Sequence, residues 1–151
     1  MTLPASLPLS MSQIATELGL SLPLSINHPW AVQLAGKGAL PVSFSDLLGK
    51  TAKFSGNLTG GSSGSLFVQF GNAPLFGGSL SELDVFLGGG GSSLSISGPP
   101  NWNGNIKVTN NTTGISLVLS KLTSTAWTSA SNPNNLIRSG VTDNFTVQPS
   151  N

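Results

Sequence analysis

Charged side chains are scarce in this sequence: Asp, Glu, Lys and Arg make up 7% of its 151 residues. Ordinary globular domains carry about 25%. The five Lys and one Arg are scattered along the chain, which argues against nucleic-acid binding. Surface polarity must come instead from Ser, Gly, Asn and Thr, which supply 68 residues. A surface of this kind suits close contact with copies of the chain or with a large assembly.

Other features are missing as well. Cys is absent, so there is no disulfide framework and no Cys-based metal site. No apolar run approaches the roughly 20 residues of a membrane-spanning helix, and the first residues lack the basic stretch of a signal peptide. Disorder is a poor interpretation, because the net charge is +1 and 38% of the residues are hydrophobic. We therefore expect a folded protein with no cofactor and no membrane partner.

Residues for catalysis are poorly supplied. The single histidine, His28, begins a predicted helix, and no nucleophile elbow accompanies it. Glu82 and Asp84 share one face of a predicted strand, but five carboxylates in the whole chain favour a solvated edge over an acid–base or Ca²⁺ site. Gly49-Lys50-Thr51 resembles the end of a phosphate-binding loop, but Phe44 stands where that pattern needs glycine. We therefore predict that the protein is not an enzyme.

A short motif occurs three times within residues 1–50. Each copy reads Leu-Pro, apolar, Ser, apolar, then Ser or Asn, and the copies are residues 7–12, 22–27 and 40–45. Proline favours an extended conformation for the residue before it. The apolar-Ser-apolar stretch that follows alternates like a short strand. Each copy therefore predicts an extended piece.

A short helix is expected after each copy. The predicted caps are the closing residues of the copies, Ser12, Asn27 and Ser45. The glycines expected to end the helices are Gly19, Gly36 and Gly49. Helices this short are not stable alone in water, so residues 1–50 form either a small helical subdomain or an arm that docks on a larger assembly. The docking candidates are Ser12, Ile14, Leu18, Asn27, Trp30, Ser45 and Leu47.

Residues 51–151 have the pattern of a β domain. The predicted strands are residues 65–70, 83–87, 94–97, 105–109, 115–119 and 144–147. Between two of them, Asn-Asn-Thr-Thr-Gly at residues 110–114 predicts a hairpin turn. Many short strands with regular turns predict a mainly β protein, with a β-sandwich or jelly-roll-like domain after the short helical segment.

The tryptophans suggest two different roles. Trp102 shares a predicted strand face with Ile106, which favours packing in the core. Trp127 lies in a polar stretch, residues 123–129, and is the better candidate for contact with a ligand or partner. An exposed Trp127 beside Asn side chains would favour the alternative function, a module that binds a host receptor or surface glycan.

The first fifty residues also resemble a segment found in many virion proteins of tailed bacteriophages. The matching stretches are residues 1–6, 9–19, 24–32, 34–36 and 42–50. This chain departs from the family-like form at His28, where Asp is usual, at Gln33, near which a basic residue is usual, and at Leu48, where an aromatic is usual. The resemblance implies a structural protein of the phage particle, such as a head decoration, fibre or tail protein, and implies no catalytic residue.

These observations combine into one functional prediction. Residues 1–50 dock on other virion proteins, and residues 51–151 form an exposed β-sandwich domain, in a particle assembled in the host cytoplasm. We expect a homo-oligomer, with a trimer as the first choice, because phage fibres and head decorations often have that symmetry.

Overall fold

The computed structural model describes residues 2–151. Three helices come first: α1 (Met11–Leu18), α2 (Pro29–Ala35) and α3 (Phe44–Leu47). The strands that follow are β1 (Phe54–Thr59), β2 (Gly61–Ser62), β3 (Ser65–Leu75), β4 (Gly78–Phe86), β5 (Ser92–Ser97), β6 (Asn105–Asn110), β7 (Ile115–Lys121), β8 (Ala126–Ser129) and β9 (Thr142–Ser150). The predicted fold class, mainly β with small N-terminal helices, is confirmed.

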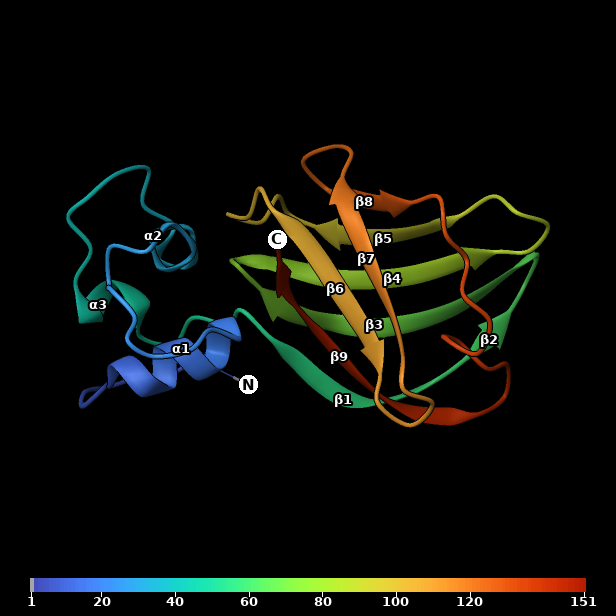
Figure 1. The fold of residues 1–151 in the computed structure, drawn as a ribbon, viewed down its shortest axis with the longest axis horizontal. Helices are drawn as coiled ribbons and strands as arrows, with labels where there is room; N and C mark the ends of the chain where they lie inside the picture. The colour runs from blue at the N-terminus through green and yellow to red at the C-terminus, as the bar shows by residue number, and fades with distance from the viewer. Residues whose placement is uncertain (1) are drawn as a thin grey trace.

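The strands form one curved antiparallel sheet in the order β1-β9-β6-β7-β8-β5-β4-β3-β2. In Figure 1, β6, β7 and β9 lie in front of β3, β4 and β5 and cross them steeply. The two outer parts of the sheet meet where the rings of Phe54 on β1 and Phe70 on β3 pack edge to face, 5.2 Å between centroids. The sheet is therefore a nearly closed barrel. The two layers expected of a sandwich are the front and back of this one sheet.

The hairpin predicted around residues 110–114 joins β6 to β7. Ile106 lies opposite Leu119, and Val108 lies opposite Leu117. All four side chains are buried, as period-2 alternation requires. The side-chain oxygen of Asn110 accepts the N–H groups of the two residues that follow Asn111, so the turn closes on its own first residue.

Strand β8 was not predicted, and it corrects the role expected of Trp127. The strand pairs with β5 on one side and β7 on the other. Trp127 lies opposite Leu94 of β5, and paired residues share one face of a sheet. Both are fully buried in the barrel, and the indole N–H of Trp127 donates to the carbonyl of Gly104 at 2.9 Å. The prediction that Trp127 contacts a ligand or partner is wrong. Trp102 is buried, as expected.

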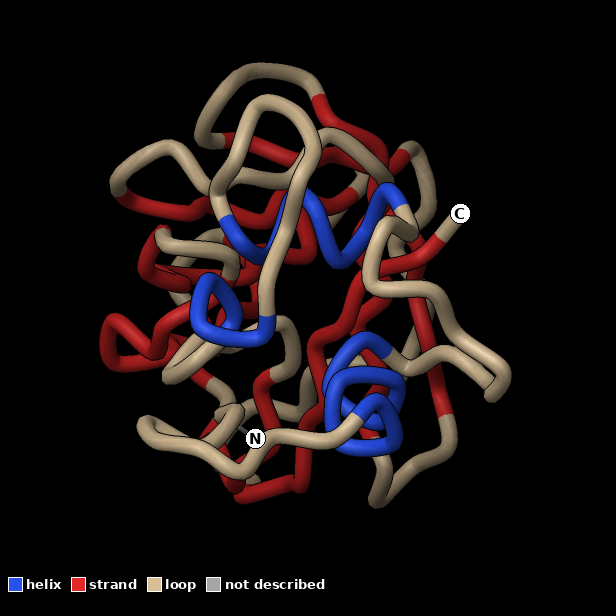
Figure 2. Tube along the Cα trace, turned by 90° about the vertical axis from the view of Figure 1, so that its left-hand side faces the viewer, coloured by secondary structure: helices blue, strands red, loops and turns tan. Residues whose placement is uncertain are grey.

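Residues 2–50, here called the helical cap, lie against one end of the barrel (Figures 1 and 2). Buried side chains of the cap, including Leu18 and Leu34, belong to the same hydrophobic cluster as Phe76 and Trp102 of the barrel. The ring of Trp30 packs edge to face on Trp102, with centroids 5.1 Å apart. The cap and the barrel therefore share one core.

The helix caps differ from the predicted ones. Ser12 and Ser45 lie inside α1 and α3, and Asn27 lies in the turn before α2. The observed N-caps are Ser10, His28 and Ser43. The first and third begin capping boxes, because Gln or Asp three residues later accepts the backbone N–H of the cap. The middle copy of the motif has no such residue three positions after its Ser, and its helix starts later, at a proline.

Two of the three predicted helix ends agree with the structure. Gly19 and Gly36 are the C-caps of α1 and α2, in the left-handed conformation with φ of 70° and 72°. Glycine adopts this conformation without the steric cost that a side chain adds. The third helix ends earlier, with Leu48 as its C-cap, and Gly49 lies one residue further on with φ of 67°.

Candidate docking surface

The three copies of the Leu-Pro motif place a leucine on the surface in the same way. Leu7, Leu22 and Leu40 are 62%, 56% and 54% exposed. Each lies at a bend of the chain rather than in an extended piece, and each Leu-Pro peptide bond is cis. The prolines that follow are exposed too. We call the three Leu-Pro pairs, residues 7–8, 22–23 and 40–41, the Leu-Pro corners.

The apolar residue just after each proline anchors the corner from within. Leu9 and Val42 are 7% exposed, and Leu24 is half-buried against the core. In the first and third copies the next residue is the helix N-cap, so the corner is fixed on both sides. The motif thus separates two apolar positions: the first Leu points outward, and the residue two positions later points inward.

The third corner precedes α3, and two charged side chains, Lys37 and Asp46, pair at the start of this helix. The backbone N–H of Ser43 donates to the Asp46 carboxylate at 2.8 Å, and the Lys37 ammonium lies 3.2 Å from the same oxygen. These bonds, with that of the Ser43 hydroxyl, lower the pKa of Asp46, the backbone bond most. Because Lys37 and Asp46 pair with each other, this side of the cap presents little uncompensated charge.

A single exposed leucine needs no explanation, but three equivalent ones on a nearly uncharged surface do. Phe44, which starts α3 within the third motif copy, is a further exposed apolar side chain at 37%. Removing an exposed leucine from water contributes on the order of 1 kcal/mol. The corners therefore offer a repeated apolar contact to a partner.

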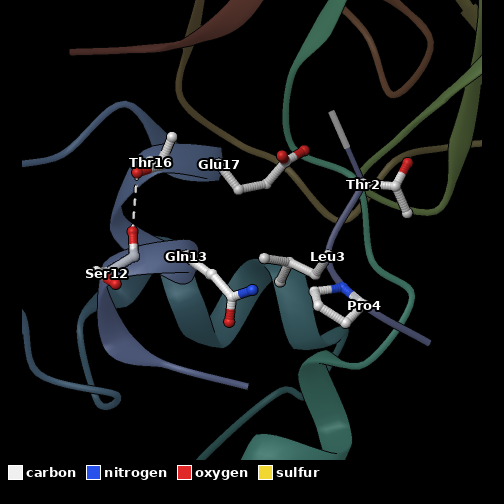
Figure 3. Close-up of a pocket in the computed structure, with 7 residues that line it drawn as sticks. All are labelled: Thr2, Leu3, Pro4, Ser12, Gln13, Thr16 and Glu17. Atoms are coloured by element: carbon white, nitrogen blue, oxygen red, sulfur yellow. Dashed lines mark hydrogen bonds between the residues drawn. The ribbon is translucent and has the colours of Figure 1, made fainter. Parts of the chain in front are cut away.

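A hollow of about 270 Å³ lies on the cap between α1 and the extended residues at the start of the chain. Its lining, shown in Figure 3, is Thr2, Leu3, Pro4, Ser12, Gln13, Thr16 and Glu17. The hydroxyl of Thr16 donates to the carbonyl of Ser12 at 2.9 Å, so this hydroxyl is engaged within the helix. The hollow is lined by two apolar residues, by neutral polar side chains and by one carboxylate.

That carboxylate, Glu17, ties the cap to the barrel. It is 2% exposed, and its Oε1 atom accepts the backbone N–H groups of Ala52 at 2.8 Å and Lys53 at 3.0 Å. Burial raises the pKa of Glu17, and the two backbone bonds partly offset that rise. Sequence reasoning missed this residue. The available signal was its position three residues after Ile14, on the apolar face of the helix.

The predicted docking residues divide into three groups by burial. Ile14, Leu18 and Leu47 are fully buried, so no partner can contact their side chains in this fold, and their assignment as docking contacts is wrong. Trp30 is half-buried, packed on Trp102. The exposed members are Ser12, Asn27 and Ser45. The leucines of the corners were missed, although the motif itself contained them.

Glu82 and Asp84 lie on the outer face of β4. Gln69 donates to Glu82 at 3.1 Å, and the Ser65 hydroxyl donates to Asp84 at 3.0 Å. Partial burial raises the pKa of Asp84, as does the neighbouring Glu82, while the bond from Ser65 lowers it.

Across residues 2–151 no three His, Cys, Asp or Glu side chains gather in a group able to hold a metal ion. None of the helices in this range has the length and apolar character needed to span a membrane.

Comparisons with protein-family models, with curated proteins and with solved structures find no match to this chain.

Proposed function

We propose that this protein is a structural component of a tailed-phage virion and that its helical cap docks on the particle through the Leu-Pro corners. The observation that carries the proposal is the repeated exposure of Leu7, Leu22 and Leu40 on a cap with few charges. The resemblance of residues 1–50 to a segment of phage virion proteins supports the same role.

The chemistry of the corners indicates the partner. A Leu-Pro pair offers apolar area and no charge, so it fits a neighbouring virion protein with shallow apolar hollows and few charged groups. Stable interfaces bury about 800 Å² on each partner, which is more than three leucines supply. We therefore propose that several copies of the chain dock together as a homo-oligomer, with a trimer as the first choice.

The test is incorporation into particles after the three leucines are replaced together, Leu7→Ser, Leu22→Ser and Leu40→Ser. Loss of three contacts worth about 1 kcal/mol each predicts roughly 100-fold weaker binding to the particle. The matched control is Leu122→Ser, which changes a leucine that is 67% exposed in the turn between β7 and β8. Copy number per particle is measured by quantitative mass spectrometry, and cryo-electron microscopy of wild-type particles locates the chain on the head, tail or fibre.

Two results would contradict the proposal. One is a triple variant that incorporates as well as the control. The other is a wild-type protein that purifies as a stable monomer and is absent from particles. Circular dichroism of the triple variant establishes that a failure to incorporate is not a failure to fold, which is expected because the three leucines lie on the surface.

A further inference from the structure

A long irregular segment, residues 130–141, joins β8 to β9 at the end of the barrel away from the helical cap (Figure 1). Four hydrogen bonds join it to neighbouring elements: three are accepted by its backbone carbonyls, and one is donated by its own Asn132 side chain. They are Ser92 Oγ to the carbonyl of Ser131, Asn132 Nδ2 to that of Phe86, Thr113 Oγ1 to that of Asn135, and Asn110 Nδ2 to that of Leu136. Two side chains of the segment, Leu136 and Ile137, are buried. A loop this long and this well fixed is typical of a functional segment.

The loop forms one wall of a cleft of about 490 Å³, and the turn between β4 and β5 forms another. The cleft has the volume of a small-ligand site. Its apolar lining is Leu66, Val85, Leu87, Pro133 and Ile137. Its polar lining is Asn132, Asn134, Asn135 and Arg138, with the backbone of Gly88.

The asparagines of this cleft have hydrogen-bonding capacity to spare. Within residues 2–151, the side chains of Asn134 and Asn135 make no hydrogen bond, and Asn132 uses only its bond to the Phe86 carbonyl. Asn135 also adopts a left-handed backbone conformation, with φ of 64°, which few residues other than Gly, Asn and Asp accept. The fold thus fixes the backbone of these amides while leaving their polar groups for a ligand.

The charge of Arg138 is balanced inside the protein. Its Nε donates to Asp143 at 3.0 Å and its Nη2 donates to the other oxygen of the same buried carboxylate. The second terminal nitrogen, Nη1, donates no bond within the described chain. The cleft therefore presents donors and acceptors without net charge, which favours a neutral, hydroxyl-rich ligand over an anion.

We propose that this cleft binds a neutral glycan. A primary amide offers a donor and an acceptor together, a combination that matches neighbouring sugar hydroxyls. The apolar side chains that line the cleft suit the C–H face of a sugar ring, and Nη1 of Arg138 is a further donor to a hydroxyl. The inference does not depend on docking by the cap, because the cleft lies at the other end of the molecule.

The test is binding of the full chain to an array of defined neutral and carboxylated oligosaccharides. The glycan with the strongest signal is then titrated against the double variant Asn134→Ala with Asn135→Gly, since glycine accepts the left-handed backbone. Loss of two amide contacts of about 1 kcal/mol each predicts at least tenfold weaker binding. The matched control is Asn72→Gly, which changes an exposed asparagine on β3 that also has a left-handed backbone, with φ of 61°; it is expected to bind as the wild type does.

The inference is overturned if no neutral glycan binds, if only carboxylated glycans bind, or if the double variant binds as tightly as the wild type. The double variant should unfold at the same midpoint temperature as the wild type. An unchanged midpoint shows that its loss of glycan binding comes from the lost amides and not from unfolding. Failure of this test leaves particle docking untouched, because incorporation and glycan binding are measured separately on variants at opposite ends of the chain.

Discussion

Replacement of Glu17 tests whether the helical cap and the barrel are joined by a specific buried contact. Glu17→Ala removes the acceptor for the N–H groups of Ala52 and Lys53. A buried donor left without a partner costs about 1–3 kcal/mol. Ala52 is fully buried whereas Lys53 is half-exposed, so water can satisfy only the second. We expect the alanine variant to lose about 2–3 kcal/mol of unfolding free energy. Most of this loss comes from the unpaired N–H of Ala52, and a smaller part comes from the N–H of Lys53.

Glu17→Gln separates the hydrogen bonds from the charge. Both backbone bonds end on one atom, Oε1, and the amide oxygen of glutamine can take its place. At neutral pH the glutamine variant is expected to lie within about 1 kcal/mol of the wild type. Urea unfolding, followed by circular dichroism and by tryptophan fluorescence, measures all three proteins.

The difference in unfolding free energy between the wild type and Glu17→Gln should change with pH in a definite direction. Burial raises the pKa of Glu17 in the folded protein, so the folded state binds the proton more tightly than the unfolded state. The resulting stability is fully present below the unfolded pKa and is lost as pH rises through the folded pKa. The stability of the wild type minus that of Glu17→Gln should therefore increase as pH falls from 7 toward 4. Other titrating groups cancel in this difference.

Two outcomes would refute this account of Glu17. The first is an alanine variant whose stability lies within about 0.5 kcal/mol of the wild type, the range of ordinary surface substitutions. The second is a difference between wild type and glutamine variant that decreases on acidification. The first result would mean that the bonds accepted by Glu17 contribute little to the stability of the folded protein. The second would mean that the folded protein lowers the pKa of Glu17 instead of raising it.

Two further substitutions test the cap and the loop. Ser10→Ala removes the observed N-cap of α1 and should lower the unfolding free energy by about 1 kcal/mol. Ser12→Ala should change the unfolding free energy by less than about 0.5 kcal/mol. If thermal unfolding showed equal losses for the two variants, Ser12 would again be the better candidate for the cap. Asp143→Asn weakens the buried pair with Arg138 and should cost about 2 kcal/mol at pH 7, less than a fully buried pair because Arg138 is partly exposed. Hydrogen bonds from Arg138, and then from Asn110, lower the pKa of Asp143, so this contribution is present at neutral pH and lost as pH falls through the lowered pKa. Urea unfolding from pH 7 to 3 that shows a constant gap between wild type and variant would contradict it.

Strands β6 and β7 could be predicted from their own residues, because inward-facing apolar residues recur at every second position and Asn110 supplies a local turn signal. Strand β8 lacks both features, since Trp127 is its one large apolar side chain. Its neighbours β5 and β7 decide that Trp127 faces inward, and they come from distant parts of the chain. Period-2 patterns cannot reveal a pairing of that kind.

In the helical cap, the sequence pattern did not predict which leucines would be exposed. Leu7 and Leu9 are two residues apart, so an extended chain would place them on one face. The bend at Leu7 separates them, and one is 62% exposed while the other is 7% exposed. The helix starts were within reach of the sequence, because Ser10 with Gln13 and Ser43 with Asp46 both fit the capping-box spacing. The prediction favoured the last polar residue of each motif copy and overlooked the reciprocal partner three positions after the first.

The shared core links the two proposals physically. Leu18 and Leu34 of the cap belong to one hydrophobic cluster with Phe76 and Trp102 of the barrel, so the cap is not a flexible arm. Its orientation relative to the barrel is fixed by packing and by the bonds of Glu17. A partner that holds the Leu-Pro corners therefore also fixes the direction of the barrel axis. Residues 130–141, which supply part of the lining of the asparagine-lined cleft, run along the end of the barrel away from the cap (Figure 1). Docking of the cap on a particle would therefore turn that cleft outward.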